Sequence, residues 1–107
     1  MVATSFDDLV AQVTIPEDGT ISRTIFQDDQ VKVVLFGFAA GQELSEHTAS
    51  TAAILHIVQG HATVGLDIEL LEAGPNAWIH MPPRMPHSIK ARTPVVMLLI
   101  LLKAAAG

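Results

Sequence analysis

The five histidines are the side chains of this sequence best suited to chemistry, because the chain contains no cysteine. Imidazole nitrogens bind transition metals and exchange protons near neutral pH. The absence of cysteine excludes a disulfide framework, a thiolate zinc site and a cysteine nucleophile. No grouping of Ser, His and Asp at motif spacing suggests a hydrolase, and the seven glycines form no phosphate-binding loop. Any metal would therefore have to be held by His, Asp or Glu.

Short runs rich in β-branched and apolar residues must position these histidines, and such runs follow one another along most of the chain after Pro16. Turn signals separate the runs, among them Gly41, Gly60 and the pair Pro82-Pro83. Regular short strands with turns between them predict an all-β sandwich or barrel. The predicted strands span residues 20 to 27, 31 to 39, 52 to 59, 61 to 66, 68 to 72, 77 to 81, 86 to 91 and 94 to 102.

The N-terminal residues 4 to 14 have a helical pattern rather than a strand pattern. Their apolar side chains recur at helical spacing, with Thr4 or Ser5 as the N-cap and two aspartates in the first turn. Pro16 and the turn after it would stop such a helix. The sequence therefore predicts a short N-terminal helix in front of the strands.

Two segments of the chain resemble the two motifs of the cupin superfamily. In GQELSEHTASTAAILHIVQG, Gly41, His47 and Gly60 fall at the first glycine, the first histidine and the closing glycine of the first motif. In GPNAWIHMPPRMPHSIKA, Pro82 and His87 fall at the proline and the histidine of the second motif. The resemblance implies an antiparallel double-stranded β-helix, the jelly-roll or cupin barrel, with a ligand pocket inside it.

The first motif departs from the family pattern at two of its metal ligands. In the family, two histidines and a glutamate of the first motif and the histidine of the second converge on one metal ion inside the barrel. Here His47 and His87 remain, while Ala49 stands in place of the second histidine and Ala53 in place of the glutamate. Zinc sites normally have three or four protein ligands, and oxygenase iron has two histidines and a carboxylate. Two imidazoles alone therefore make a poor metal site.

A third ligand would have to come from elsewhere in the chain, and His56 is the strongest candidate. Side chains two positions apart on a strand share a face, so an inward Ala53 places His56 outside. A bulge of one residue would reverse that alternation and bring His56 into the barrel. Glu43 shares the parity of His47, but it lies in a predicted loop, where parity is unreliable, and it is the weaker candidate.

The candidate metal ligands are therefore His47, His87 and His56, for one divalent transition metal (Zn, Ni, Fe, Mn or Cu) that binds weakly or not at all. Alanines in place of two ligands leave a wider and less polar cavity, which suits a small organic molecule. We expect a small cupin-barrel protein with a small-molecule binding pocket around two histidines and a degraded or atypical metal site. The alternative is a metal-dependent cupin enzyme of the dioxygenase or isomerase type. A third hypothesis is a structural or regulatory dimer module without turnover.

Charge and hydropathy limit the partners and the location of the protein. The net charge of −5, from 11 acidic and six basic side chains, argues against a nucleic-acid partner, which needs clustered Lys and Arg. The most apolar run, Val95 to Leu102, has eight residues, against about 20 for a membrane-spanning helix. The N-terminus has no basic cluster before an apolar run, so we expect no signal peptide, no membrane partner and a cytoplasmic location.

The apolar run from Val95 to Leu102 also predicts a homodimer. A strand that is apolar on both faces needs cover on both faces, and in a small chain a second subunit easily provides the outer one. Alternation with Ile79 directs Trp78 and His80 outward, which would leave an exposed apolar patch on a monomer. We therefore expect residues 1–107 to form a single cupin domain that pairs with a second copy.

Overall fold

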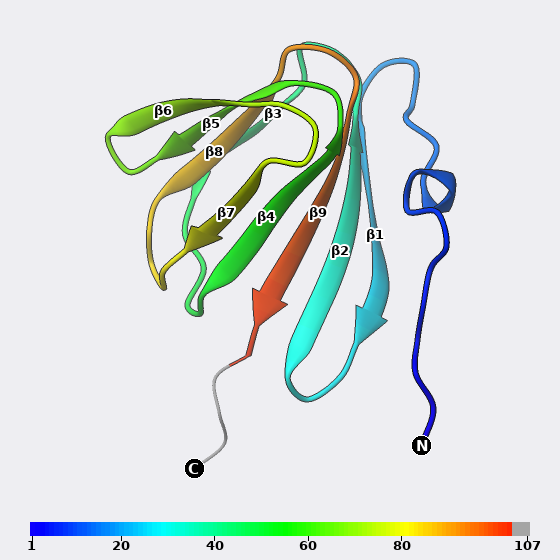
Figure 1. Cartoon of the computed structure of the whole chain (residues 1–107). Helices are drawn as coiled ribbons and strands as arrows, with labels where there is room; N and C mark the ends of the chain where they lie inside the picture. Colours follow the sequence, from blue (N-terminus) through cyan, green and yellow to red (C-terminus); the bar gives the residue numbers. More distant parts are fainter. Residues whose placement is uncertain (104–107) are drawn as a thin grey trace.

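The chain folds into two antiparallel β-sheets that enclose a common apolar core (Figure 1). The computed structural model describes residues 1–103. The larger sheet has the strand order β1-β2-β9-β4-β7, and the smaller sheet has the order β3-β8-β5-β6. The strands are β1 Thr20–Gln27, β2 Val31–Phe38, β3 Glu43–His47, β4 Ala53–Gln59, β5 Ala62–Leu66, β6 Glu69–Ala73, β7 Trp78–Met81, β8 His87–Ala91 and β9 Val95–Leu102. The prediction of an all-β fold is confirmed.

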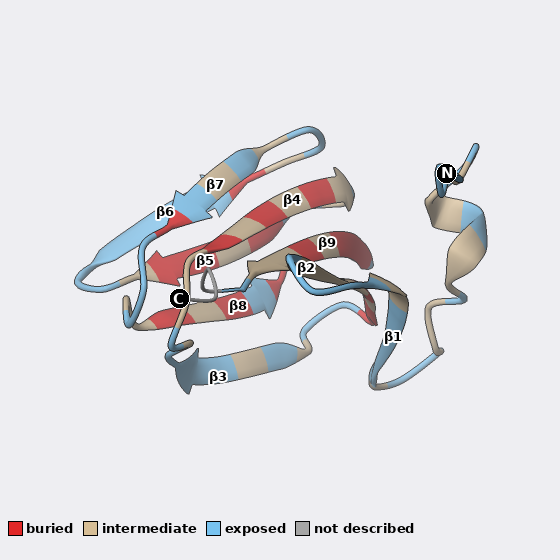
Figure 2. Ribbon diagram, turned by 90° about the horizontal axis from the view of Figure 1, so that it is seen from below, coloured by how far each residue is buried: buried red, intermediate tan, exposed pale blue. Residues whose placement is uncertain are grey.

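The two sheets form a jelly-roll sandwich with open edges rather than a closed barrel. β7 is an edge of the larger sheet and β6 is an edge of the smaller one, and no hydrogen-bonded ladder joins the sheets within residues 1–103. Figure 2 shows β6 and β7 on the same side of the molecule. We call the gap between the unpaired edge strands β6 and β7 the open seam. Leu71 of β6 is the cross-strand partner of the buried Val64, yet it is 43 % exposed beside this open seam. The expected barrel is thus corrected to a sandwich whose two sheets are not joined by a ladder along either side in the described residues.

The predicted N-terminal helix is wrong in extent, because the structure has a single 3-10 turn at Val10–Gln12. Leu9 stands at the N-cap and makes no side-chain cap hydrogen bond, while Asp8 accepts one from the Val10 backbone N–H at 3.1 Å. A segment this short does not hold a helix without tertiary support. Phe6 and Leu9 instead line a groove against the larger sheet, and that packing keeps the segment extended. No helix in the described part of the chain is long and apolar enough to cross a membrane.

Side-chain alternation along β4 shows how the strands divide core from surface. Ala53, Leu55 and Ile57 are at most 2 % exposed, and they belong to the core between the sheets. Ile54 and His56 point to the opposite face and are half-buried. Figure 2 shows the resulting alternation of buried and intermediate residues along β4. Successive residues of a strand face opposite sides of the sheet, so this is the orientation that the sequence predicts.

Gly60 supports the turn that leads from β4 into β5, and we expect Gly60→Ala to destabilise the protein by about 3 kcal/mol. Gly60 has a φ of +90°, and an added Cβ would collide with the Pro94 carbonyl oxygen. Gly41→Ala is a matched control, because Gly41 has a φ of +84° but open space around an added Cβ. Gly41→Ala should lower the free energy of unfolding by only about 1 kcal/mol, the cost of a positive φ in a residue other than glycine. Urea unfolding measures both changes, and equal losses would contradict the steric argument.

Candidate functional site

The structure brings His47 and His87 together at one end of the smaller sheet. His47 is the last residue of β3 and His87 is the first residue of β8, and the two are direct cross-strand partners. Their ring centroids lie 4.1 Å apart, with an interplanar angle of 62°. Two residues that are 40 positions apart in the sequence thus form an edge-to-face imidazole pair.

A bulge in β3 decides which side chains accompany this pair. Leu44 pairs with Ile89 and His47 pairs with His87, so an advance of three residues along β3 matches an advance of two residues along β8. The extra residue lets Leu44 and His47 both face the inside of the sandwich. Glu43 lies on the other side of the bulge, where its carboxylate is 3.5 Å from the Lys90 ammonium on the outer face. The prediction that Glu43 faces the same side as His47 is therefore wrong, because the bulge breaks the alternation between Glu43 and His47.

Backbone hydrogen bonds fix the tautomer of both rings. His47 Nδ1 lies 2.8 Å from the Ser45 carbonyl oxygen, and His87 Nδ1 lies 3.0 Å from the Met85 carbonyl oxygen. A carbonyl oxygen can only accept, so each Nδ1 carries the proton and donates it. Each neutral ring then keeps its lone pair on Nε2, which can accept a hydrogen bond or bind a metal.

Burial differs between the two rings and keeps His87 neutral. His87 is 5 % exposed, whereas His47 is exposed at the edge of the sheet. Loss of hydration lowers the pKa of His87 below its ordinary value, the hydrogen bond to the Met85 carbonyl opposes this, and the charge of a protonated His47 lowers it further. At neutral pH, His87 is therefore uncharged and acts as an acceptor at Nε2.

His56 lies on a different surface from the imidazole pair. It is on the outer face of the larger sheet, where its cross-strand partners are Trp78 and Leu98. β4 does have a register shift against β9, but it falls between Ile57 and Gln59, after His56. The alternation from Ala53 to Ile57 is unbroken, so the structure does not bring His56 to the other two histidines.

The residues around the pair do not fit the resident metal that the cupin resemblance implies. Ala53 is 2 % exposed and belongs to the apolar core, and Ala49 is half-buried in the loop before β4. Within residues 1–103, no group of three or more His, Asp or Glu side chains could hold a metal ion. Two neutral imidazoles leave the ligand shell incomplete for zinc and for oxygenase iron alike.

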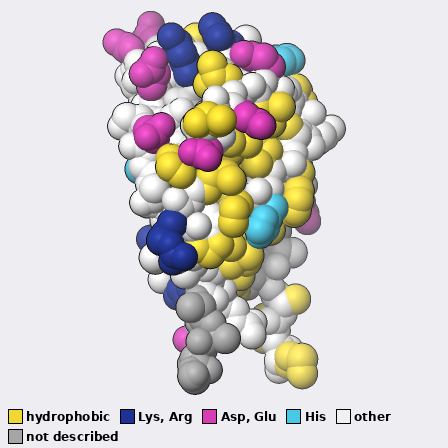
Figure 3. Space-filling model, turned by 90° about the vertical axis from the view of Figure 1, so that its left-hand side faces the viewer, with side chains coloured by type: hydrophobic (Ala, Val, Ile, Leu, Met, Phe, Trp, Pro, Cys, Tyr) yellow, Lys and Arg dark blue, Asp and Glu magenta, His cyan; other side chains and the backbone are white. Residues whose placement is uncertain are grey.

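A cavity of about 360 Å³ lies at the turn between β5 and β6, and its lining includes neither His47 nor His87. Leu66, which lines it, is the cross-strand partner of His87, and Met85 contributes both a lining side chain and the carbonyl that binds His87 Nδ1. The rest of the lining comes from Asp67, Ile68, Glu69 and His80. Figure 3 shows the side of the molecule on which β6 lies, with hydrophobic side chains in a band bordered by acidic and basic groups.

The sequence did not assign Asp67 and His80 to the neighbourhood of the pair. It assigned Asp67 to a turn and His80 to an outward position, and both residues are indeed exposed. The missing information is tertiary, because the Asp67 backbone N–H bonds the Pro86 carbonyl oxygen at 2.8 Å and ties this turn to the residue before His87. A positive φ of 57° at Asp67 is compatible with its turn chemistry, but nothing in the sequence says where the turn packs.

Comparison with known proteins identifies the fold. The sequence matches no protein-family model and no curated protein. A conserved protein of unknown function from Streptococcus pyogenes is similar in structure with a TM-score of 0.87 and 29 % identity, covering 99 % of this chain and 93 % of that one. A cupin superfamily protein from Desulfitobacterium hafniense has a TM-score of 0.85 and 27 % identity, covering 90 % of this chain and 88 % of its own.

A more distant structure in the same group is an enzyme. The salicylate 1,2-dioxygenase of Pseudaminobacter salicylatoxidans has a TM-score of 0.74 and 13 % identity, with 78 % of this chain covered and 26 % of that one. Identity this low shows a shared fold and carries no chemistry across. In the two more similar structures the match extends over 99 % and 90 % of this chain. The chain is a small protein of the cupin fold.

Proposed function

We propose that this protein binds a small organic molecule that presents an O–H or N–H donor to Nε2 of His47 and His87. The observation that carries the proposal is the shared hydrogen-bond arrangement of the two rings, in which both Nδ1–H groups are used by backbone carbonyls. No hydrogen bond to either Nε2 is found within residues 1–103. The pair therefore offers two neighbouring acceptors with fixed ring orientations.

The surroundings of the pair favour a ligand with an apolar body. Leu66, the cross-strand partner of His87, and Met85, whose carbonyl binds His87 Nδ1, belong to the apolar cluster around the core and also line a neighbouring cavity. The cavity of about 360 Å³ falls in the usual size range of small-molecule sites, roughly 300 to 1,000 Å³. An uncharged His87 favours a neutral donor such as a phenol or an alcohol over an anion. The proposed protein is a homodimer of such binding domains, without a membrane or nucleic-acid partner.

A metal-dependent enzyme is the second candidate, and one observation favours it. Histidines that bind metals usually donate their other ring N–H to a carbonyl or a carboxylate, as His47 and His87 do here. The same arrangement serves a hydrogen-bonding ligand equally well. We place the binding protein first because the described residues offer no third and fourth ligand for a metal beside the two histidines.

Phenol and benzene form a matched pair of probes for this site. In a titration followed by NMR, phenol should shift the ring signals of His47 and His87, and benzene should leave them unchanged because it has no donor. His87→Phe should reduce the affinity for phenol at least about tenfold, since a buried acceptor is lost. His61→Phe is the control, because His61 is exposed and lies elsewhere. Equal binding of phenol and benzene, or phenol binding that survives in His87→Phe, would refute the proposal.

A further inference from the structure

Arg84 has a backbone conformation that arginine rarely adopts. Its φ is 65°, in the left-handed region. A backbone hydrogen bond of 3.3 Å closes the turn of residues 82 to 85, with Pro83 and Arg84 at its two central positions. Proline followed by a positive φ is typical of a type II turn, whose second central position favours glycine or asparagine. The other residues with a side chain and a positive φ in the described part of the chain are Asp67 and Asn76, whose residue types tolerate this conformation.

The contacts of this turn do not need an arginine side chain. The Arg84 backbone N–H donates a hydrogen bond to the Ala49 carbonyl oxygen at 2.8 Å. A glycine would make the same bond and would adopt the positive φ without strain. The strained position therefore carries a long cationic side chain that the local structure does not require. Residues held in such conformations cluster at binding sites.

The hydrogen bond between Arg84 and Ala49 joins the two loops that border the imidazole pair. Ala49 lies two residues after His47, and Arg84 lies three residues before His87. The two histidines are cross-strand partners, and Met85, the neighbour of Arg84, supplies the carbonyl that binds His87 Nδ1 at 3.0 Å. Arg84 thus stands at the rim of the pair.

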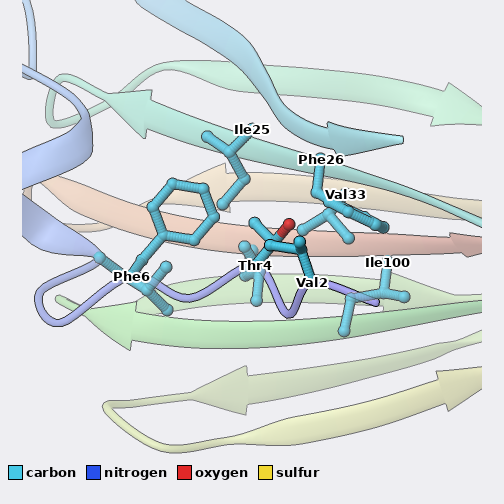
Figure 4. Close-up of a pocket in the computed structure, with 9 residues that line it drawn as sticks. Val2, Thr4, Phe6, Ile25, Phe26, Val33 and Ile100 are labelled. Carbon is cyan, nitrogen blue, oxygen red and sulfur yellow. The ribbon is translucent and has the colours of Figure 1, made fainter. Parts of the chain in front are cut away.

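The guanidinium of Arg84 is exposed and makes no hydrogen bond or ion pair within residues 1–103. The other two arginines are engaged. Arg23 donates to the Gln12 carbonyl oxygen at 2.9 Å and so holds the N-terminal segment, which lines a groove with β1, β2 and β9 (Figure 4). Arg92 donates to the Thr63 hydroxyl at 2.7 Å and forms an ion pair with a glutamate. The donors of Arg84 are therefore available to a ligand.

The acidic side chains close to the pair in sequence or in space leave this guanidinium unpaired. Glu46 precedes His47, but it lines a groove with Glu43 and Lys90, which lie on the outer face of the smaller sheet. Asp67 is tied to the residue before His87 through its backbone, and it lines the cavity at the turn between β5 and β6. The rim of the pair thus carries an open cation in a protein of net charge −5.

We propose that Arg84 selects the ligand of the imidazole pair by binding a carboxylate at the far end of that ligand. This assignment rests on the proposed function, in which Nε2 of both rings accepts hydrogen bonds from a neutral donor at the near end. A guanidinium binds a planar carboxylate through two parallel N–H···O bonds. The expected ligand is therefore a small hydroxy acid, such as a phenol that carries a carboxylate, with an apolar body between its two polar ends.

The charge at the rim favours a carboxylate over a phosphate. Arg84 is the only Lys or Arg in residues 48–52 and 82–86, the two loops that border the pair. A phosphate monoester carries nearly two negative charges at neutral pH, and its three oxygens call for further donors. A single guanidinium matches the single charge and the planar shape of a carboxylate.

The phenol 4-hydroxyphenylacetate and its amide, 4-hydroxyphenylacetamide, test this assignment because they differ in charge and hardly in size. In NMR titrations at neutral pH, both should shift the ring signals of His47 and His87, and the acid should bind at least about fivefold more tightly. The acid alone should shift the Nε–H signal of Arg84. Equal affinities would overturn the role of Arg84 and leave the proposed function standing. If neither probe shifts the ring signals, the proposed function fails and the role of Arg84 fails with it.

Two substitutions separate the charge of Arg84 from its backbone. Arg84→Gln and Arg84→Gly should both bind the acid and the amide about equally, with the affinity for the amide unchanged. Arg84→Gly should unfold in urea at least as late as the unchanged protein, because relief of the positive φ offsets the added freedom of the unfolded chain.

Arg92→Gln is the control for net charge, since Arg92 follows the end of β8 opposite to His87. It should keep the preference for the acid. A preference that survives in Arg84→Gln, or that Arg92→Gln loses equally, would overturn the assignment. Early unfolding of Arg84→Gly together with loss of amide binding would assign the side chain to the structure of the loop and overturn it as well.

Discussion

A chain carrying both Ala49→His and Ala53→Glu should bind Zn²⁺ or Ni²⁺ at least about a thousandfold more tightly than the unchanged protein. The two substitutions add the imidazole and the carboxylate that the cupin resemblance expects at these positions. His47 and His87 already have their Nδ1 protons held by backbone carbonyls, so their Nε2 lone pairs are available. The change therefore raises the number of candidate protein ligands from two to four.

The stability of this double variant should depend on the metal. Ala53 is 2 % exposed, and an ionised glutamate there without a counter-ion costs several kcal/mol. A divalent metal supplies that counter-charge, and a ligand that binds only the folded state raises the melting temperature by mass action. Calorimetry in EDTA and in excess Zn²⁺ should thus show a low melting temperature that the metal restores.

Three comparisons give the metal result its meaning. Ala62→Glu buries a carboxylate at a position that is 0 % exposed in the same core, and Zn²⁺ should not rescue it. His47→Ala added to the double variant should abolish the rescue. Any metal bound by the unchanged protein should likewise be lost in His47→Ala and in His87→Ala. Tight metal binding by the unchanged protein would contradict the incomplete site and make the metal-dependent enzyme the first candidate.

Side-chain periodicity predicted the parts of this fold that depend on burial alone. Ala53, Leu55 and Ile57 face the core as alternation requires, because a shift by one residue would put three apolar side chains on the other face of the sheet. The glycine at position 60 has the positive φ that its turn requires. These features follow from local sequence, and they set the strands that carry His47 and His87.

The remaining features depend on tertiary contacts that no local pattern records. The bulge in β3 separates Glu43 from His47, and an extra residue in a strand leaves no signature in composition. The N-terminal segment has helical spacing, yet Phe6 and Leu9 pack on the larger sheet and hold it extended. The lack of pairing between β6 and β7 and the cavity lined by Leu66 and Met85 likewise follow from how the two sheets meet.

Acid should destabilise the unliganded protein as the pH falls below about 6.5, because of His87. Burial holds the pKa of His87 below its ordinary value in the folded state, whereas the imidazole of the unfolded chain is not buried. Between the two pKa values the unfolded state binds more protons, so lowering the pH favours unfolding. The contribution of a neutral His87 is fully present above the unfolded pKa of about 6.5, declines below it, and levels off at the folded pKa. One histidine of this kind changes the free energy of unfolding by at most about 1.4 kcal/mol per pH unit.

Urea unfolding at intervals between pH 5 and pH 7.5 measures this dependence. His87→Phe keeps a planar ring that cannot titrate. In this variant the free energy of unfolding should vary less with pH than in the unchanged protein. His61→Phe removes an exposed histidine and should leave the curve as it is. Asp28 does not interfere, because backbone hydrogen bonds from Gln30 and Val31 lower its pKa from 3.8, and its contribution is lost only in stronger acid. A slope that persists in His87→Phe would show that a group other than this buried imidazole takes up the proton on unfolding.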